Sequence, residues 1–150
     1  FVLIDRSMPG LEEDVYEEVG EKSTNPVMLK PFGLMFQALD DLKKNEVYIC
    51  TGASPRYALW GGLMSTRAMK LGGAGAVLHG WSRDTNEILD LNFPTFSIGG
   101  YPQDPGPRGK VVEFRISIEL EGIKIKPGDL IYGDGDGEVG DPKAAGEEGY

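Results

Sequence analysis

Cysteine and histidine are nearly missing from this chain of 150 residues, in which Cys50 and His79 are the only residues of these types. A single cysteine excludes a disulfide within the chain and a thiolate metal cluster. Nucleophilic catalysis that depends on histidine would have to use His79, but we expect this side chain to pack or to cap a neighbouring element. Cys50 lies in a predicted strand, so we expect its thiol to be buried and inert.

Basic residues and long apolar runs are also scarce. The 15 Lys and Arg residues are outnumbered by 24 Asp and Glu residues, which gives a formal net charge of −9. No basic stripe is present to neutralise phosphates, which argues against a nucleic-acid partner. No apolar run approaches the ~18 residues that a membrane-spanning helix needs, and no signal-peptide pattern opens the chain. We therefore expect a cytoplasmic protein without a membrane partner.

The length suits one domain, and we expect residues 1–150 to form a single domain. The chain begins without methionine inside the apolar run FVLID and ends in the polar, glycine-rich run DPKAAGEEGY. From these two ends we expect that parts of both termini lie outside the sequence.

Helices and strands alternate in the first half of the chain. Apolar residues recur with helical spacing at 31–44, and β-branched and aromatic residues predict a strand at 46–51. The other predicted elements are strands at 1–4, from about residue 76 and at 95–99, helices within 59–71 and at 84–91, and an acidic surface excursion at 6–26.

The second half, 109–134, alternates apolar and polar residues with period two. Turn signals at Glu121-Gly122 and Pro127-Gly128 divide it into hairpins. A helix–strand half followed by a hairpin-rich half predicts a mixed α/β domain of layered type.

Two glycine-rich runs are similar to ligand-binding loops but fit structural roles better. GGAGAVLHG (72–80) follows a helix and precedes a strand, the reverse of a dinucleotide-binding loop, so we interpret it as a helix C-cap and a tight loop. DGDGEVGD (134–141) begins a run with Val139 and Ala145 where a calcium loop needs glycine and glutamate. We interpret it as a polar hairpin turn.

Arg83 and Asp84 lie side by side just after a predicted strand, where layered α/β folds concentrate ligand-binding residues. Arginine offers a forked, permanently charged donor, and aspartate offers a hard oxygen ligand for Mg²⁺ or Mn²⁺. The pair by itself is also explained as an ion pair or, for Asp84, as a helix cap.

A glycine-led helix start lies upstream of this pair, at Gly61, Gly62, Leu63 and Met64. Free N–H groups at such a helix start bind carboxylates well. Together with Arg83 and a metal-binding Asp84, this start suits a 2-oxo acid substrate. The amides would receive its carboxylate, and the arginine and the metal would face its keto oxygen.

Three runs, GGLMSTRAMKLGGAGAVLHGWSRD, LNFPTFSIG and GIKIKPGDLIYGDGDGEV, are similar in order and spacing to a known family. It contains the class II 4-hydroxy-4-methyl-2-oxoglutarate aldolases and the regulators of ribonuclease E activity A (RraA-like proteins). The resemblance extends over residues 32–139 and implies a swivelling β/β/α domain. It also implies a homotrimer or hexamer with active sites at subunit interfaces.

Carried over by position, the backbone of Gly61 to Met64 would bind the pyruvyl carboxylate and Arg83 would contact the keto or enolate oxygen. Asp84 would ligate a divalent cation, Mg²⁺ or Mn²⁺. The resemblance implies a lyase that cleaves 4-hydroxy-2-oxo acids to pyruvate and also decarboxylates oxaloacetate. No residue is assigned as the base that removes the 4-hydroxyl proton.

The chain departs from the family's pattern at three places. Gly62 stands where many members carry an acidic residue, His79 stands where aspartate or asparagine is commoner, and GEVGDP (137–142) replaces an apolar final strand. Two alternatives to the aldolase therefore stay open: a non-catalytic regulator that binds and inhibits a ribonuclease E-like partner, and a lyase or isomerase acting on an unrelated oxo acid.

Overall fold

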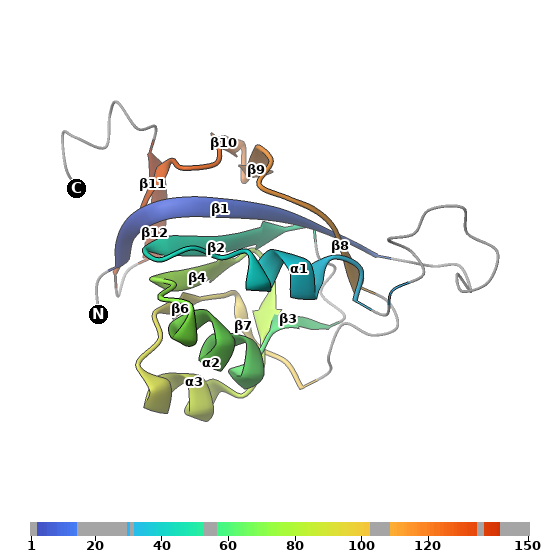
Figure 1. The fold of residues 1–150 in the computed structure, drawn as a ribbon, viewed down its shortest axis with the longest axis vertical. Coiled ribbons are helices and arrows are strands. Elements are labelled where there is room, and N and C mark those ends of the chain that lie inside the picture. Colours follow the sequence, from blue (N-terminus) through green and yellow to red (C-terminus); the bar gives the residue numbers. More distant parts are fainter. Residues whose placement is uncertain are drawn as a thin grey trace.

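A mixed β-sheet forms the centre of the molecule, with helices on one face and a β-hairpin on the other (Figure 1). The computed structural model describes residues 3–14, 30, 32–52, 57–102, 109–134 and 137–141. The strands of the main sheet are β1 Leu3–Asp14, β2 Glu46–Thr51, β4 Gly75–Leu78, β6 Thr95–Phe96, β8 Gly109–Phe114, β11 Leu130–Asp134 and β12 Gly137–Asp141. Their order is β12-β11-β1-β2-β4-β6, with β8 also paired to β1.

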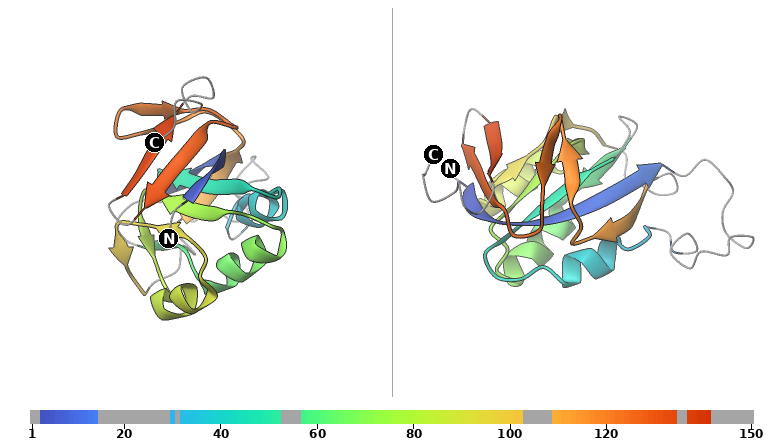
Figure 2. Two further views of the ribbon diagram at one scale, coloured as in Figure 1. Left: turned by 90° about the vertical axis from the view of Figure 1, so that its left-hand side faces the viewer. Right: turned by 90° about the horizontal axis from the view of Figure 1, so that it is seen from above.

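Strands β1, β2, β4 and β6 run parallel to one another, and β8, β11 and β12 are antiparallel to their partners. Parallel neighbours are joined by crossovers that carry helices, so the first half of the chain supplies the helical layer. Figure 2 shows β1 running along the whole sheet, where it pairs with β11 near its start and with β8 near its end.

Side chains of β2 alternate between the two faces of the sheet. Tyr48 and Cys50 pack into the cluster under the helices α1 Met35–Asp40, α2 Gly62–Lys70 and α3 Thr85–Leu91. Val47 and Ile49 pack on the opposite face, against the hairpin formed by β9 Ile118–Leu120 and β10 Ile123–Ile125. Because both faces are covered, β2 is apolar at successive positions. The predicted layered α/β architecture is confirmed.

The helices are short, at six, nine and seven residues. In the part of the chain that the structure describes, no helix is long and apolar enough to cross a membrane. Helix α2 ends in a Schellman motif: the N–H of Gly72 donates to the carbonyl of Met69 at 3.0 Å, and that of Gly73 to Ala68 at 2.9 Å. Gly72 has φ +83°, which favours glycine. The C-cap interpretation of GGAGAVLHG is therefore confirmed.

A second, small sheet continues the first beyond its carboxyl edge. It consists of the parallel strands β3 Ala58–Trp60, β5 Trp81–Ser82 and β7 Gly99–Gly100. Trp60 is in register with Ser82. This pairing brings the residues that follow β3 next to those that follow β5.

The predicted surface excursion at 6–26 is wrong for its first part, because residues 6–14 belong to β1. Pro9 lies within this strand. It lies where β1 changes its antiparallel partner from β11 to β8, and its carbonyl accepts the N–H of Arg115 at 2.7 Å. The missing N–H of proline would point to that same side, where the ladder is already interrupted. Residues 15–29 lie outside the described part.

Two other predicted elements are shorter than expected. The helix at 31–44 is reduced to α1, because Gly33 adopts φ +60° and the N–H of Leu34 bonds to the carbonyl of Val111 in β8. The strand at 95–99 is divided into β6 and β7, since Ser97 and Ile98 cross from the main sheet to the small one.

Of the hairpins predicted for the second half, the one at Glu121-Gly122 is confirmed as β9–β10. Pro127-Gly128 forms a turn, but β10 and β11 on its two sides are not paired with each other. Glu121 and Gly122 both have positive φ, as a two-residue hairpin turn requires, and Gly128 has φ +84° in the turn that follows Pro127. DGDGEVGD spans the paired strands β11 and β12, and its turn residues 135–136 lie outside the described part. The polar run GEVGD is nevertheless a strand, at the edge of the sheet.

Candidate functional site

The end of β3 and the end of β5 place the predicted site residues side by side. The N–H of Arg83 donates to the carbonyl of Trp60 at 2.9 Å, which extends the parallel pairing by one residue. Gly61 and Arg83 therefore leave the small sheet together, although they are far apart in the sequence. The structure brings together all the residues that the sequence nominated: Gly61, Gly62, Leu63, Met64, Arg83 and Asp84.

Helix α2 begins at Gly62, with Gly61 as an extended N-cap residue that has no side chain to cap the helix. Hydrogen bonds from buried side chains fix the start of this helix in position. The indole N–H of Trp60 donates to Ser65 Oγ at 2.7 Å, and Ser65 Oγ in turn donates to the carbonyl of Gly61 at 3.1 Å. The backbone at the start of α2 is thus fixed in place by groups that are themselves buried.

The carboxylate of Asp84 caps α2 rather than its own helix. Asp84 occupies the N-cap position of α3 in the left-handed conformation, with φ 58°, and makes no side-chain capping bond there. Its Oδ2 instead accepts the N–H of Gly62 at 3.1 Å. The helix-cap interpretation is therefore correct for the position of Asp84 in the chain but not for the direction of its side chain.

Two N–H groups in the first turn of α2 remain available for a ligand. In the described part of the chain, neither the N–H of Leu63 nor that of Met64 has a hydrogen-bond acceptor. Such groups at the amino end of a helix carry partial positive charge and attract anions. Of the four amides that the sequence nominated, the one at Gly62 is already used by Asp84.

The guanidinium of Arg83 is only loosely associated with Asp84. Its Nε lies 4.0 Å from Asp84 Oδ2, with 39% and 43% of the two side chains exposed. An exposed pair at this distance contributes little to stability. Arg83 donates no side-chain hydrogen bond within the described residues, so its forked donor is available to a ligand.

The two glycines leave room for these side chains. A Cβ added to Gly61 would lie 3.2 Å from Asp84 Oδ2 and 3.3 Å from Arg83 Nε. A Cβ added to Gly62 would overlap the carboxylate of Glu87. A side chain at residue 61 or 62 would therefore enter the space at the start of α2 that the side chains of Arg83, Asp84 and Glu87 surround.

Glu87 is the site residue that sequence reasoning missed. Its carboxylate occupies the position that a side chain of residue 62 would take, which is the position where an acidic residue had been expected from the family resemblance. The available signal was its spacing: Asp84 and Glu87 are three residues apart at the start of a helix, so they lie on the same side of it.

The donor set fits a divalent cation of the Mg²⁺ type. Mg²⁺ is commonly held by one or two carboxylates and several waters rather than by a full protein cage. Asp84 and Glu87 reach the same glycine, one at its nitrogen and the other over its α-carbon. No group of three or more His, Cys, Asp or Glu side chains suited to a metal occurs among the described residues.

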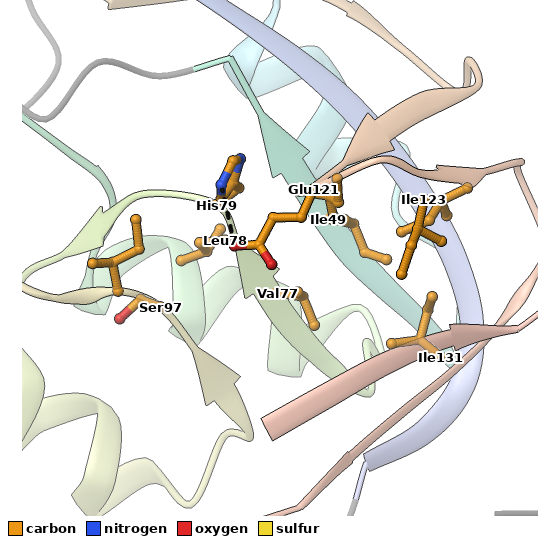
Figure 3. Close-up of a pocket in the computed structure, with 11 residues that line it drawn as sticks. Ile49, Val77, Leu78, His79, Ser97, Glu121, Ile123 and Ile131 are labelled. Atoms are coloured by element: carbon orange, nitrogen blue, oxygen red, sulfur yellow. Dashed lines mark ion pairs between the residues drawn. The ribbon is translucent and has the colours of Figure 1, made fainter. Parts of the chain in front are cut away.

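His79 lies elsewhere, at a cavity on the hairpin side of the sheet (Figure 3). Its Nδ1 is 3.0 Å from Thr51 Oγ1, and its Nε2 is 3.9 Å from Glu121 Oε1. The cavity measures about 230 Å³ and is lined mainly by aliphatic side chains such as Ile49, Val77 and Ile131. Neither Arg83 nor Asp84 lines it, so the structure does not bring His79 to the amino end of α2.

Glu12 and Cys50 are among the buried groups whose pKa values are displaced. Burial, followed by the charge of Asp14, raises the pKa of Glu12 to about 8, and Glu12 is only 2% exposed. Burial, and then the charge of Glu12, raises the pKa of the Cys50 thiol well above its ordinary value. Cys50 is completely buried, as expected from the sequence, and its thiol stays protonated.

Comparison with known protein families gives a match over most of the chain. The family model described as RraA-like, Aldolase/RraA, matches residues 11–139. An uncharacterized protein of Methanocaldococcus jannaschii is 30% identical over 122 residues, which cover 80% of this chain and 58% of that protein. A Burkholderia mallei protein provisionally named 4-hydroxy-4-methyl-2-oxoglutarate aldolase is 36% identical over 86 residues, 57% of this chain and 52% of that protein.

Solved structures share the fold. RraAS2 of Streptomyces coelicolor, described as an unusual member of the RNase ES inhibitor RraA protein family, matches with a TM-score of 0.81 and 19% identity. The match covers 99% of this chain and 69% of that one. At this identity the likeness establishes the architecture alone. The chain spans less than two thirds of the length of either curated relative.

Proposed function

The chain belongs to the Aldolase/RraA family, and on that premise we propose that it is a divalent-metal-dependent lyase that acts on 2-oxo acids. Its substrates would be 4-hydroxy-2-oxo acids, cleaved to pyruvate and a second carbonyl compound, and oxaloacetate, decarboxylated to pyruvate. The observation that carries the proposal is the hydrogen bond between Gly62 and Asp84. It joins the amino end of α2 to the segment that bears Arg83, so that the proposed sites for the substrate carboxylate and the cation would be adjacent.

The substrate carboxylate would bind at the first turn of α2. The N–H groups of Leu63 and Met64 would donate to it, and the partial positive charge of the helix end favours an anion there. Trp60 and Ser65 hold the backbone of this turn in place, so the donors are already oriented before the substrate arrives.

Arg83 would stabilise the charge that develops in the reaction. When the bond between C3 and C4 breaks, its electron pair moves into C2–C3 and the negative charge appears on the C2 oxygen as an enolate. The 4-hydroxyl proton leaves in the aldol cleavage, and carbon dioxide leaves in the decarboxylation. A permanently charged guanidinium beside the C2 oxygen lowers the energy of this enolate. Protonation at C3 then gives pyruvate.

Asp84, together with Glu87, would hold the divalent cation near the same oxygen. A bound Mg²⁺ or Mn²⁺ supplies Lewis-acid stabilisation of an oxyanion. Asp84 serves two purposes in this arrangement, because Oδ2 also orients the start of α2 through Gly62. The substrate carboxylate and the cation are thus positioned relative to one another through a single side chain.

The test is pyruvate release from oxaloacetate and from 4-hydroxy-4-methyl-2-oxoglutarate, measured with lactate dehydrogenase and NADH in the presence of Mg²⁺ or Mn²⁺. We expect turnover above a control with metal but no protein, and its abolition by EDTA. Arg83→Ala should lower kcat by about 100-fold or more, the usual effect of removing one donor to an oxyanion. Equal rates for wild type, Arg83→Ala and the EDTA-treated protein would reject the proposal.

The same preparation tests the alternative, a non-catalytic regulator of a ribonuclease E-like enzyme. Purified ribonuclease E is assayed on a fluorescent RNA with and without the protein. No turnover of either oxo acid together with inhibition of the ribonuclease would favour the regulator, and turnover without inhibition would exclude it.

A further inference from the structure

Three neighbouring residues end the small sheet at its carboxyl edge, one after each strand. The N–H of Tyr101 donates to the carbonyl of Ser82 at 2.8 Å, which continues the parallel pairing of β5 with β7 by one residue. Tyr101 therefore lies beside Arg83, as Gly61 does on the other side. The order across the edge is Gly61, Arg83, Tyr101. Arg83 thus has the start of α2 on one side and an aromatic residue on the other.

Tyr101 forms an aromatic pair with Trp81. Their ring centroids are 6.3 Å apart, and the ring planes are inclined by 27°. The Trp81 ring lies over Gly99, where an added Cβ would be 2.8 Å from its Cζ3 atom. Arg83 follows Trp81 by two residues, so side-chain alternation along the extended chain places both on one face of the small sheet. The ring contact places Tyr101 on that face as well.

The Tyr101 ring is accessible to a ligand. Tyr101 is 37% exposed, and among the described residues its hydroxyl group has no hydrogen-bond partner. The side chain is therefore positioned through its ring, by Trp81. Ligand sites typically combine such apolar surface with a few convergent polar groups, and here those groups are the guanidinium of Arg83 and the first N–H groups of α2.

The proposed position of the substrate directs its C4 end toward this ring. The substrate carboxylate would bind at the first turn of α2, and the C2 oxygen would face Arg83. Neighbouring strands are about 4.8 Å apart, and C1 to C4 of an extended 2-oxo acid span roughly 4 Å. A substrate that reaches from α2 to Arg83 would therefore carry its C4 substituent beyond Arg83, on the side of Tyr101.

We infer that Tyr101, supported by Trp81, determines specificity for the C4 substituent, and that the site takes 4-hydroxy-2-oxo acids with an alkyl or aryl group at C4. The inference rests on the proposed function for the orientation of the substrate. The ring contacts the part of the substrate that leaves as the second carbonyl compound. An apolar group is stabilised when it leaves water to lie against the ring. A second carboxylate gains less, because the face of an aromatic ring is negative.

Kinetics with two substrates that differ only at C4 test the inference. The C4 atom carries hydrogen in 4-hydroxy-2-oxobutanoate and a phenyl ring in 4-hydroxy-2-oxo-4-phenylbutanoate, and pyruvate release from each is measured by chromatography with Mg²⁺ present. We expect the wild type to have the higher kcat/KM for the phenyl compound. Tyr101→Ala should lower this preference by about 10-fold, whereas Tyr101→Phe, which keeps the ring, should change it by less than about twofold.

The ratio of the two kcat/KM values separates a substrate contact from a structural role, because a damaged fold lowers both values together. Phe36→Ala is the matched control, since it removes an exposed ring from α1, and it should leave the ratio unchanged. Circular dichroism checks that each variant folds. An equal ratio in wild type and Tyr101→Ala would overturn the inference, and so would an equal fall of the ratio in Phe36→Ala.

Binding without turnover makes the failure of this inference distinguishable from the failure of the proposed function. 2-Oxo-4-phenylbutanoate lacks the 4-hydroxyl group, so it is not cleaved, and calorimetry with Mg²⁺ compares its dissociation constant with that of 2-oxobutanoate. Tighter binding of the phenyl compound that is lost in Tyr101→Ala, without pyruvate release from any substrate, would retain the role of Tyr101 and reject the lyase. Pyruvate release without a preference at C4 would retain the lyase and reject the role of Tyr101. Failure of the wild type to bind 2-oxo-4-phenylbutanoate would also reject that role.

Discussion

Glu12 shows how one side chain can make the stability of the domain depend on pH. Its carboxyl group is buried beside Tyr57 and Gly109. Burial, reinforced by the charge of Asp14, raises its pKa to about 8 from an ordinary value of 4.5. The folded protein therefore holds a proton near neutrality that the unfolded chain has already released.

The sign of the effect follows from the direction of the pKa shift. A carboxyl group whose pKa is raised in the folded state stabilises that state fully below its unfolded pKa, and this contribution is lost as the pH rises through the folded pKa. We expect the free energy of unfolding of the wild type to fall by on the order of 2–4 kcal/mol between pH 5 and pH 9. Glu12→Gln should abolish most of this fall, whereas Glu13→Gln, at an exposed neighbour, should not. Urea unfolding at several pH values measures the free energy of unfolding of each protein. Parallel pH dependences for wild type and Glu12→Gln would contradict the prediction.

Arg115 links three elements, β8, α1 and β2, through the hydrogen bonds of its side chain. This residue follows β8 in the left-handed conformation, with φ 58°. Its guanidinium donates to both carboxylate oxygens of Glu46 at 2.7 Å, to Asp41 Oδ2 at 2.5 Å and to the Asp41 carbonyl at 2.6 Å. The end of α1 and the start of β2 are thereby held to the same side chain.

Removal of this side chain should loosen all three elements. Hydrogen bonds to charged groups contribute more than neutral ones, and we expect Arg115→Ala to lower the free energy of unfolding by about 2 kcal/mol. The hydrogen bond from Arg115 lowers the pKa of Asp41; for Glu46, burial acts to raise the pKa but hydrogen bonds from Arg115 and the backbone lower it overall. The stabilisation that Arg115 gains from the two carboxylates is therefore present above the unfolded pKa values of Asp41 and Glu46. It is lost as the pH falls through their lower pKa values in the folded protein.

Thermal unfolding of wild type and Arg115→Ala at pH 7 and pH 3 checks the network. The difference between the two proteins should be large at pH 7 and small at pH 3. Arg67→Ala serves as the control, because its ion pair with Asp40 is solvent-exposed on both sides. A difference that is independent of pH would contradict the prediction.

At the scale of the whole molecule, the site lies at an open surface. Leu63, which lies in the first turn of α2, is 83% exposed, and Leu89 of α3 is 59% exposed. A second protein that covered the candidate site would also cover these exposed apolar side chains. The family resemblance implies a homotrimer or hexamer, and we expect a neighbouring subunit to lie against this surface.

Light scattering after size-exclusion chromatography measures the assembly directly. We expect a mass three or six times that of the 16.3 kDa chain. Leu63→Lys should shift the population toward the single chain, because a charge would be buried in the contact, whereas Ile123→Lys on the opposite, hairpin side should not. A single-chain mass for the wild type would reject the oligomer.

Much of the local structure could be predicted because it depends on neighbouring residues. The strand at 46–51 was predicted with its observed bounds, since its apolar and β-branched residues form one continuous run. Gly72 ends α2 for a similarly local reason, the left-handed turn that glycine allows. Arg83, Asp84 and the glycine-led helix start were also identified from the sequence, and the structure brings them together.

The sequence by itself determined where most of the helices and strands form and which residue types are available for chemistry. The tertiary structure alone decided where the side chains of Asp84 and Glu87 point. The place of Asp84 at the start of α3 is also explained as a cap of that helix, but the packing of α2 against α3 directs its carboxylate and that of Glu87 toward Gly62. The direction of a side chain depends on what lies across the contact, and Gly62 is distant from Glu87 in the sequence. β1 was underestimated for the same reason, since its pairing with β2, β8 and β11 overrides the local effect of Pro9.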